Sequence, residues 1–306
     1  KDIARAFTST SVIMSVNNSL IADALYKFGT EAQKQRYLTP LASGTLLGCF
    51  ALSEPGAGSD ASAQQTMVTR DGDVFVLNGT KNFITNALEA DLALVFATVD
   101  RSLRAKGVCA FLVEKGTPGF TITRVEKKLG LKGTSCCQVL FEHCRVPADN
   151  LLGEVGQGFK IAMVSLDSGR IGIAAQAVGI AQAALDISLR YAKERVAFDK
   201  PIASFQAIQW MIADMAVQIE AARLLTYRAA WLKDKGLRYT KESAMAKLFA
   251  SETASRAATK ALQIHGGYGY LYDFPAQRLF RDARITEIYE GTSEIQRLVI
   301  AHQLLN

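Results

Sequence analysis

The sequence predicts an α+β multidomain protein with a helical N-terminal part, a middle antiparallel β domain that resembles a barrel, and a C-terminal four-helix bundle. The hydrophobic period changes from helical to two near residue 46 and becomes helical again near residue 158. Of the 306 residues, 49% are hydrophobic, which is enough for more than one compact core. We therefore expect domains at residues 1–45, 46–150 and 151–306.

The N-terminal part should consist of short helices. Thr30 and Gln33 have capping-box spacing, which predicts a helix that begins there and is ended by Pro40. The pattern begins at Lys1 inside a helix, so we expect a further helical segment to precede it.

The middle part reads as strands joined by turns. Asp71-Gly72 and Asn78-Gly79 bracket an apolar run, residues 74–77, which predicts a strand between two tight turns. Further strands are predicted at residues 92–98, 108–113, 120–125 and 138–141.

The C-terminal part should be a bundle of long helices. Apolar residues at spacings of three and four run from Phe205 to Ala222, as on one face of a long helix. The longest charge-free apolar run, residues 171–185, is too short to span a bilayer core of about 30 Å, so no membrane span is expected. Long helices are predicted near residues 158–194, 203–235, 240–265 and 293–305.

Composition argues against several classes of protein. The five cysteines lack CxxC spacing, so we expect free thiols in a reducing compartment. The three histidines do not form HExxH, so no metal site is expected. The net charge of +6 comes from scattered basic residues. A positive net charge suits a polyphosphate cofactor, but the scattered basic residues form no localised patch for nucleic acid.

One carboxylate lies at a break between two helical patterns. Ser293 and Gln296 have capping-box spacing, so a helix should begin near Ser293 and leave Glu290 and Gly291 on the preceding turn. A turn can direct a carboxylate into a pocket, which makes Glu290 a candidate catalytic base. The alternative is a solvated loop glutamate.

A glycine-rich segment, residues 49–60, ends in Gly56-Ala57-Gly58-Ser59-Asp60. It fits a loose Rossmann pattern, but a true dinucleotide motif opens a helix. This one leads into hairpin sequence at residues 67–77. A structural turn is the other interpretation.

Residues 288–296 and 49–60 resemble the C-terminal and flavin-binding signatures of the acyl-CoA dehydrogenases. Residues 81–86, 195–198, 206 and 263–267 follow in the order and rough spacing of that family. Within the family, residues 281–287 look most like the short-chain, butyryl-CoA type. The resemblance covers essentially the whole chain and implies that FAD is the cofactor.

The resemblance implies a set of FAD-binding residues: Phe50, Ala51, Leu52, Ser53, Gly58, Ser59, Phe83, Ile84, Thr85, Arg195, Phe198, Gln206, Gln263, Gly266, Gly267, Thr292, Ser293 and Glu294. By the same resemblance, residues 263–267 act on the FAD of a neighbouring subunit. Taken alone, Arg195 could be a surface charge at a helix C-terminus, and Gly266-Gly267 could end a helix. The family usually has tryptophan where Phe83 stands, so shielding of the flavin ring should persist without an indole N–H.

The implied acyl-CoA-binding residues are Ser59, Asp167, Ser168, Gly169, Arg170, Tyr289 and Gly291. Gly291 would lie against the thioester, where a side chain would collide with substrate. Without the resemblance, residues 167–170 could equally be an exposed salt-bridging turn.

The implied activity is oxidation of a short-chain acyl-CoA to the trans-2-enoyl-CoA, with Glu290 as the base. A glutamate is a weak base in water, but exclusion of water beside flavin and acyl chain can raise its pKa toward neutrality. Electron transfer flavoprotein would accept the electrons, and a homotetramer built as a dimer of dimers is expected. The location would be the mitochondrial matrix in a eukaryote or the cytoplasm in a bacterium. The alternatives are an acyl-CoA oxidase and a non-catalytic assembly factor.

Overall fold

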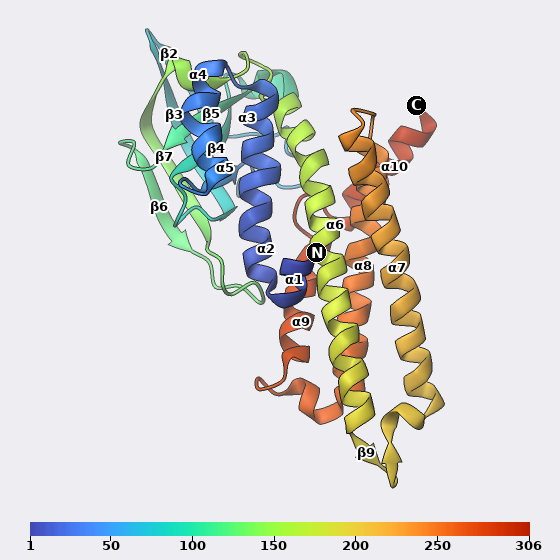
Figure 1. The fold of residues 1–306 in the computed structure, drawn as a ribbon. Helices are drawn as coiled ribbons and strands as arrows, with labels where there is room; N and C mark the ends of the chain where they lie inside the picture. Colours follow the sequence, from blue (N-terminus) through green and yellow to red (C-terminus); the bar gives the residue numbers. More distant parts are fainter. The chain divides into compact units, whose positions relative to one another are not determined.

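The structure, a computed structural model, describes residues 1–306 (Figure 1). Its contacts divide the chain into two compact units. The sheet unit contains residues 13–128 and 133–169, and the helical unit contains residues 1–12, 129–132 and 170–306. The predicted change of hydrophobic period therefore corresponds to a real change from sheet to long helices.

Short helical segments precede the sheet, as predicted. They are α1 (Asp2–Ala6), α2 (Thr8–Ser15), the π-helical η1 (Val16–Ala22), α3 (Asp23–Phe28), α4 (Glu31–Gln33), the π-helical η2 (Lys34–Leu38) and α5 (Thr39–Ser43). The capping box of Thr30 and Gln33 is confirmed. The prediction that Pro40 ends this helix was wrong, because Pro40 lies in the first turn of α5, where no backbone N–H is needed. The helix ends instead at Gly44, which has a φ of 76°.

The sheet unit contains one eight-stranded sheet in the order β6-β7-β3-β2-β4-β5-β8, and β1 pairs with β4. Its pairs are antiparallel except those of β4 with β1 and with β2. All of the predicted strands are present. The strands are β1 (Gly48–Ala51), β2 (Met67–Asp71), β3 (Val74–Thr85), β4 (Leu92–Thr98), β5 (Val108–Glu114), β6 (Phe120–Val125), β7 (Cys136–Pro147) and β8 (Leu151–Leu152).

The turn predicted at Asp71-Gly72 joins β2 to β3, but the turn predicted at Asn78-Gly79 was wrong. Strand β3 continues through Asn78-Gly79 because it pairs with β7 on both sides, with a register shift next to Gly79. A Cβ on Gly79 would lie 2.6 Å from the Cα of Thr66. The glycine is therefore needed at a β-bulge with a close backbone approach.

The helical unit is built on α6 (Gly158–Glu194) from residue 170 onward, α7 (Gln206–Asp234) and α8 (Thr240–His265), which run side by side in Figure 1. Helix α8 also contacts α9 (Pro275–Arg284) and α10 (Ser293–Leu305). The predicted bundle is confirmed, and α9 was missed. Alanines dominate the core between α6, α7 and α8, and such small side chains let the helix axes approach closely.

Short elements complete the chain. A two-stranded hairpin, β9 (Val196–Ala197) and β10 (Lys200–Pro201), follows α6. The 3₁₀ turns are η3 (Arg101–Gly107), η4 (Ala148–Asn150), η5 (Ile202–Ser204), η6 (Gly266–Tyr270) and η7 (Ile285–Glu287). By length and composition alone, α6 could cross a membrane, yet 67% of its most apolar window is buried inside the protein. Core helices of water-surrounded bundles meet the same criterion.

The five cysteines are free thiols, and all belong to the sheet unit. Four are buried and Cys136 is partly buried. Burial raises the pKa of Cys49 to about 12 and the pKa of Cys136 and of Cys144 to about 11. These thiols are therefore protonated at neutral pH.

Candidate functional site

Glu290 lies on the irregular turn between η7 and α10, as predicted. Its φ of 51° is in the left-handed region, and the following Gly291 has a φ of 92°. A Cβ on Gly291 would lie 2.6 Å from Nε2 of Gln296. Glycine is therefore required at position 291, whereas Glu290 adopts a conformation that is costly for a residue with a side chain.

The Glu290 carboxyl group is kept away from water. Part of the residue reaches the surface, but its Oε2 has essentially no accessible area and no hydrogen-bond partner. Burial raises the pKa of Glu290 to about 7, although the charges of Lys247 and Arg170 oppose the rise. The solvated-loop alternative is therefore wrong. A carboxyl group with a pKa near neutrality suits general-base catalysis.

Helix α10 begins at Ser293, as predicted, but the predicted cap was wrong. Thr292 is the N-cap, and its Oγ1 accepts a hydrogen bond from the N–H of Ile295 at 3.3 Å. Gln296 does not close a capping box with Ser293. Its Nε2 donates instead to the carbonyl oxygens of Glu290 at 3.2 Å and of Gly291 at 2.9 Å.

Tyr289, predicted to bind substrate, is tied to α6 by its side chain. Its hydroxyl donates to Oε1 of Gln176 at 2.7 Å. Burial raises the pKa of Tyr289 well above its usual value. The phenol therefore stays neutral and fixes one side of the turn that carries Glu290.

Residues 167–170, predicted to contact coenzyme A, lie within α6. The exposed-turn alternative is wrong, because Ser168 and Arg170 are only 3% and 5% exposed. Arg170 is close enough to Glu290 for its positive charge to lower the pKa of that carboxyl group. A contact of these residues with coenzyme A stays a prediction.

In the sheet unit, the two segments predicted to line the flavin are brought together. Phe50 and Ala51 belong to β1, and residues 52–66 form the following loop. The N–H of Asn82 on β3 donates to the carbonyl oxygen of Ser53 at 2.8 Å. The Nζ of Lys81 donates to the carbonyl oxygen of Leu52 at 3.2 Å. Strand β3 then continues into Phe83, Ile84 and Thr85.

A buried ion pair anchors this loop. Lys81 Nζ lies 2.6 Å from Oε1 of Glu54, and both side chains are inaccessible to solvent. The carboxylate also accepts the backbone N–H groups of Gln65 and Thr66. Burial alone would raise the pKa of Glu54, but Lys81 and these amides outweigh it and the pKa is lowered. Burial likewise lowers the pKa of Lys81, to about 8.

The glycine-rich loop does not open a helix, so the rejection of a Rossmann site is confirmed. No atom lies within 4 Å of a Cβ placed on Gly56 or Gly58, and neither has a positive φ. The protein's own packing therefore does not require glycine at either of these exposed positions. Phe83 is 64% exposed and has a φ of 60°, so an aromatic ring is held outward on a strained backbone.

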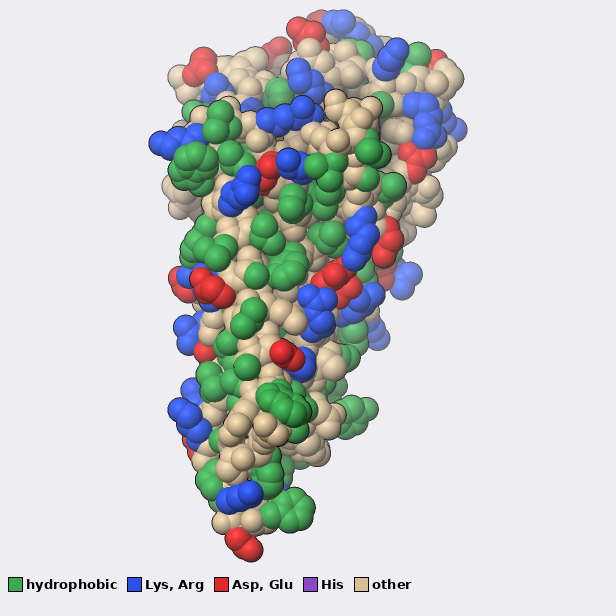
Figure 2. Space-filling view, turned by 90° about the vertical axis from the view of Figure 1, so that its right-hand side faces the viewer, with side chains coloured by type: hydrophobic (Ala, Val, Ile, Leu, Met, Phe, Trp, Pro, Cys, Tyr) green, Lys and Arg blue, Asp and Glu red, His purple; other side chains and the backbone are tan.

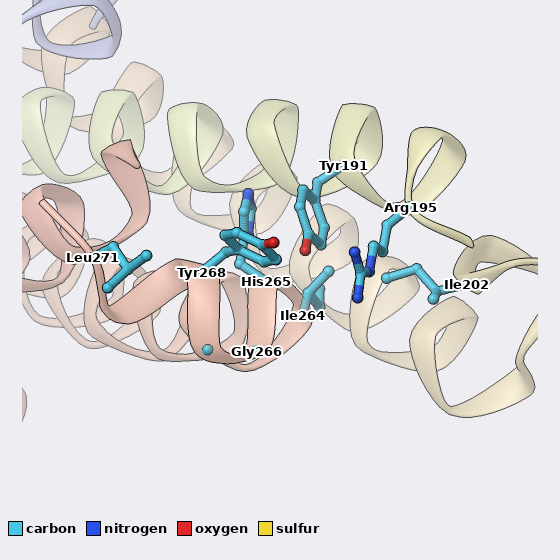
Figure 3. A pocket seen from close by; sticks show the side chains of 9 residues that line it. Tyr191, Arg195, Ile202, Ile264, His265, Gly266, Tyr268 and Leu271 are labelled. Atoms are coloured by element: carbon cyan, nitrogen blue, oxygen red, sulfur yellow. The ribbon is translucent and has the colours of Figure 1, made fainter. Parts of the chain in front are cut away.

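A pocket of about 460 Å³ in the helical unit brings Arg195 together with Gly266 and Gly267. Figure 3 shows Tyr191 on α6, and Arg195 directly after the end of α6, on the side of the pocket that faces His265 and Tyr268. The rings of Tyr191 and His265 stack at 4.3 Å, and the Arg195 guanidinium lies 5.6 Å from the centre of the Tyr268 ring. Gly266 also ends α8, as the alternative interpretation of Gly266-Gly267 predicted. Ending a helix is compatible with a binding role for the same glycines.

Other predicted cofactor residues do not line this pocket. Phe198 lies on the β9–β10 hairpin, is 87% exposed and has a φ of 52°. Gln206 and Gln263 are exposed on α7 and α8. Thr292, Ser293 and Glu294 lie at the start of α10, where Thr292 is the cap and Ser293 Oγ is buried without a hydrogen bond.

The sequence reasoning missed Lys247, Gln296 and Gln176 as residues around Glu290. Lys247 is fully buried on α8, and its Nζ donates to the carbonyl oxygen of Gly291 at 2.6 Å. A signal was present, because Lys247 falls in the small-residue stripe of α8 at helical spacing. That stripe includes Ser243, Ala246, Ala250 and Ala254. A cation in such a stripe has to be buried.

Comparisons with known proteins agree with this geometry. Residues 1–45, 49–144 and 156–305 match the N-terminal, middle and C-terminal domains of acyl-CoA dehydrogenase, respectively. The chain is 58% identical over 305 residues to the mitochondrial short-chain specific acyl-CoA dehydrogenase of Homo sapiens, covering 100% of this chain and 74% of that protein. It is 53% identical over 300 residues to acryloyl-CoA reductase (NADH) of Anaerotignum propionicum, covering 97% and 76%. Butyryl-CoA dehydrogenase from Megasphaera elsdenii has a solved structure with a TM-score of 0.98 at 50% identity, covering 99% of this chain and 80% of that one. The chain belongs to the acyl-CoA dehydrogenase family.

Proposed function

We propose that this protein oxidises short, straight acyl-CoA thioesters such as butyryl-CoA to trans-2-enoyl-CoA. The observation that carries the proposal is the Glu290 carboxyl group, which is shielded from water and has a pKa of about 7. Relatives named short-chain specific acyl-CoA dehydrogenase and butyryl-CoA dehydrogenase support the substrate class.

In the proposed reaction the Glu290 carboxylate takes a proton from the carbon next to the thioester carbonyl. A hydride leaves the next carbon, and the two carbons become doubly bonded. A carboxylate with few hydrogen bonds is a stronger base than one in water, and its pKa near neutrality leaves it substantially ionised at physiological pH. Donors near the thioester oxygen would stabilise the developing negative charge, and the N–H of Glu290 is the proposed protein donor.

Bound FAD would supply the hydride acceptor. The residues present fit this cofactor on two counts. No protein atom lies within 4 Å of a Cβ placed on Gly56 or Gly58, so the backbone there is open to a ligand. Arg195 lines a pocket with Gly266 and Gly267, where its planar guanidinium can pair with phosphate oxygens. The remaining cofactor and substrate residues named from the family resemblance are part of this proposal, as is the three-part division at residues 45 and 150.

Electron transfer flavoprotein is the proposed electron acceptor, with oxygen as the alternative acceptor of an oxidase. The similarity to an acryloyl-CoA reductase makes the reverse reaction a second candidate, in which electrons from NADH reduce an enoyl-CoA. Hydrogen peroxide formed in air would indicate an oxidase. Oxidation of NADH with acryloyl-CoA, in the presence of an electron transfer flavoprotein, would indicate a reductase.

The test is anaerobic reduction of the bound flavin by butyryl-CoA, followed as loss of flavin absorbance. Glu290→Gln should retain flavin and ligand binding and lose reduction by at least about a thousandfold, because the amide cannot accept the proton. Glu31→Gln is the matched control, since Glu31 is an exposed glutamate on α4. Bleaching of Glu290→Gln at the normal rate would remove Glu290 from this role.

The acyl length is tested in the same assay with C4, C8, C16 and branched acyl-CoAs. We expect the fastest bleaching with the C4 thioester. A preference for C16 would overturn the short-chain proposal and leave the base assignment intact. A yellow protein that no acyl-CoA bleaches would favour the non-catalytic assembly factor.

We further propose a homotetramer, built as a dimer of dimers. Trp210, Val217, Leu224 and Trp231 recur every seven residues on α7 and are between 55% and 70% exposed. Figure 2 views the side of the molecule on which α7 lies and shows hydrophobic side chains along this face, interspersed with charged ones. Apolar residues that recur at this spacing suit helix packing against a second copy. The matrix of mitochondria in a eukaryote, or the bacterial cytoplasm, is the proposed location.

A further inference from the structure

The turn that carries Glu290 is conformationally costly and has to be held by its surroundings. Two successive residues, Glu290 and Gly291, have positive φ angles of 51° and 92°. For glutamate this backbone region is sparsely populated and persists only when neighbouring groups fix it. The direction of the base therefore depends on what binds the backbone on either side of it.

Two buried side chains from different helices bind that backbone. Gln296 on α10 donates from Nε2 to the carbonyl oxygens of both Glu290 and Gly291. Lys247 on α8 donates from Nζ to the carbonyl oxygen of Gly291 at 2.6 Å. Both donor side chains are fully buried, and the hydrogen bonds that they make are partly buried. Gln296 and Lys247 make similar contacts, but only Lys247 adds a charge.

Lys247 is an unusual residue in its position. It lies on the alanine-rich buried face of α8, where an uncharged side chain would avoid the cost of desolvation. Burial lowers the pKa of Lys247 to about 8, and the negative charge of Glu290 is the main influence that opposes the fall. The effect is mutual, because Lys247 is the largest influence that keeps the pKa of Glu290 from rising further.

Other charged groups act on the same pair. Arg170 from α6 favours the ionised form of Glu290 and disfavours the charged form of Lys247. Glu287 on η7 and Glu294 on α10 favour the charged form of Lys247. Tyr289, beside Glu290, stays neutral. The charge of Lys247 is therefore one of two cationic influences on the base, and Lys247 also binds the turn through a hydrogen bond to Gly291.

We propose that Lys247 is a positioning residue with two separable roles: its amine holds the Gly291 carbonyl so that Glu290 keeps its direction, and its positive charge keeps Glu290 ionised and available as a base. Gln296 shares the first role and lacks the second. The kinetic readout of this proposal rests on the proposed dehydrogenase function, whereas the proposal itself concerns the turn and its charges.

The kinetic test compares pH profiles of kcat/KM in the flavin-loaded enzyme. In Lys247→Met the acid limb should move to higher pH by about one unit or more, because Glu290 loses a favourable charge; a shift of one unit lowers the rate on that limb about tenfold. Lys247→Arg, which keeps the charge, should retain the limb near its wild-type position. Gln296→Met should lower kcat without moving the limb.

Lys260→Met is the matched control, because Lys260 lies on the same helix and pairs with Asp214 at the surface. Its profile should coincide with that of the wild type. If Lys247→Met does not fold, Lys247→Gln provides the same comparison, since it keeps a donor and removes the charge. An acid limb that stays in place in either uncharged variant would overturn the electrostatic role.

Two measurements do not depend on turnover. Infrared titration of the carboxyl band, with Glu290→Gln as the blank, should show protonation of Glu290 at higher pH in Lys247→Met. Amide hydrogen exchange at residues 288–293 should accelerate in both Lys247→Met and Gln296→Met, because each removes a bond that fixes the turn. Unchanged exchange in both variants would overturn the holding role. If wild-type enzyme does not bleach with any acyl-CoA, the proposed function fails while these two measurements still decide the role of Lys247.

Discussion

Two buried lysines show how differently the protein uses a cation that is out of water. Lys81 forms an ion pair with Glu54 at 2.6 Å and so shares its charge with a direct partner. Lys247 donates to a carbonyl oxygen, and the carboxylate it influences, Glu290, has an oxygen without any hydrogen bond. The first arrangement satisfies both charges. The second leaves a carboxyl group poised to react.

Such a carboxyl group should make stability depend on pH. The pKa of Glu290 is raised from 4.5 to about 7 in the folded protein. A raised pKa means that the folded state binds the proton more tightly, so this contribution is fully present below pH 4.5 and is lost as the pH rises through 7. Glu290→Gln does not titrate. Relative to the wild type, it should gain roughly 1–3 kcal/mol of stability between pH 5 and pH 8.

Urea denaturation of the flavin-free protein at both pH values measures this difference. Comparing the two proteins at each pH cancels the titration of groups that do not interact with Glu290. Lys247 is the exception, because the charge of Glu290 raises its pKa. A stability difference that is the same at pH 5 and pH 8 would contradict the raised pKa.

At the scale of elements, the loop of residues 52–66 depends on charge pairing for its shape. It contains little regular structure. The side chains of Glu54 and Gln64 bond backbone groups within the loop, and Lys81 links the loop to β3. This explains how a glycine-containing loop can be held in one conformation beside a sheet.

Lys81→Met should therefore destabilise the sheet unit by about 3–5 kcal/mol, because it leaves the Glu54 carboxylate buried without its partner. The double variant Lys81→Met with Glu54→Gln should recover part of this loss. Guanidinium denaturation followed by circular dichroism gives both values. A loss below about 1 kcal/mol for Lys81→Met would show that water reaches Glu54.

Local patterns predicted the elements whose ends are set locally. The bounds of α6, α8 and α10 agree with the predictions because apolar periodicity marks all three, and a glycine marks the start of α6 and the end of α8. Asn78-Gly79 was misread because pairing of β3 with β7 outweighs the turn preference of that dipeptide. Pro40 was misread because proline is tolerated in a first helical turn.

The site was predictable only in part. Glu290 and the glycine-rich loop were found because each lies in one short stretch of sequence. Lys247, by contrast, meets Gly291 across 44 residues and through the packing of α8. Spacing along the chain does not encode such a contact. The expected Ser293–Gln296 box failed for a local reason, because Gln296 bonds carbonyl oxygens five and six residues before it instead.

At the scale of the whole molecule, the recurring apolar residues of α7 should control assembly. Val217→Glu combined with Leu224→Glu places two charges on this apolar face and should dissociate the oligomer into smaller species. Sedimentation velocity measures the change.

Leu103→Glu is the control, because Leu103 is an exposed leucine on η3 in the sheet unit. It should leave the sedimentation coefficient unchanged. An unchanged coefficient for the α7 double variant would show that copies associate through another face.

The location of the five thiols allows unfolding of the sheet unit to be followed by cysteine alkylation. All five belong to that unit, four are buried, and burial raises their pKa values. An alkylating reagent such as iodoacetamide attacks thiolate, so the native protein should be modified slowly and the opened unit rapidly. The mass added per molecule over time would then count opening events of the sheet unit alone, with no engineered label.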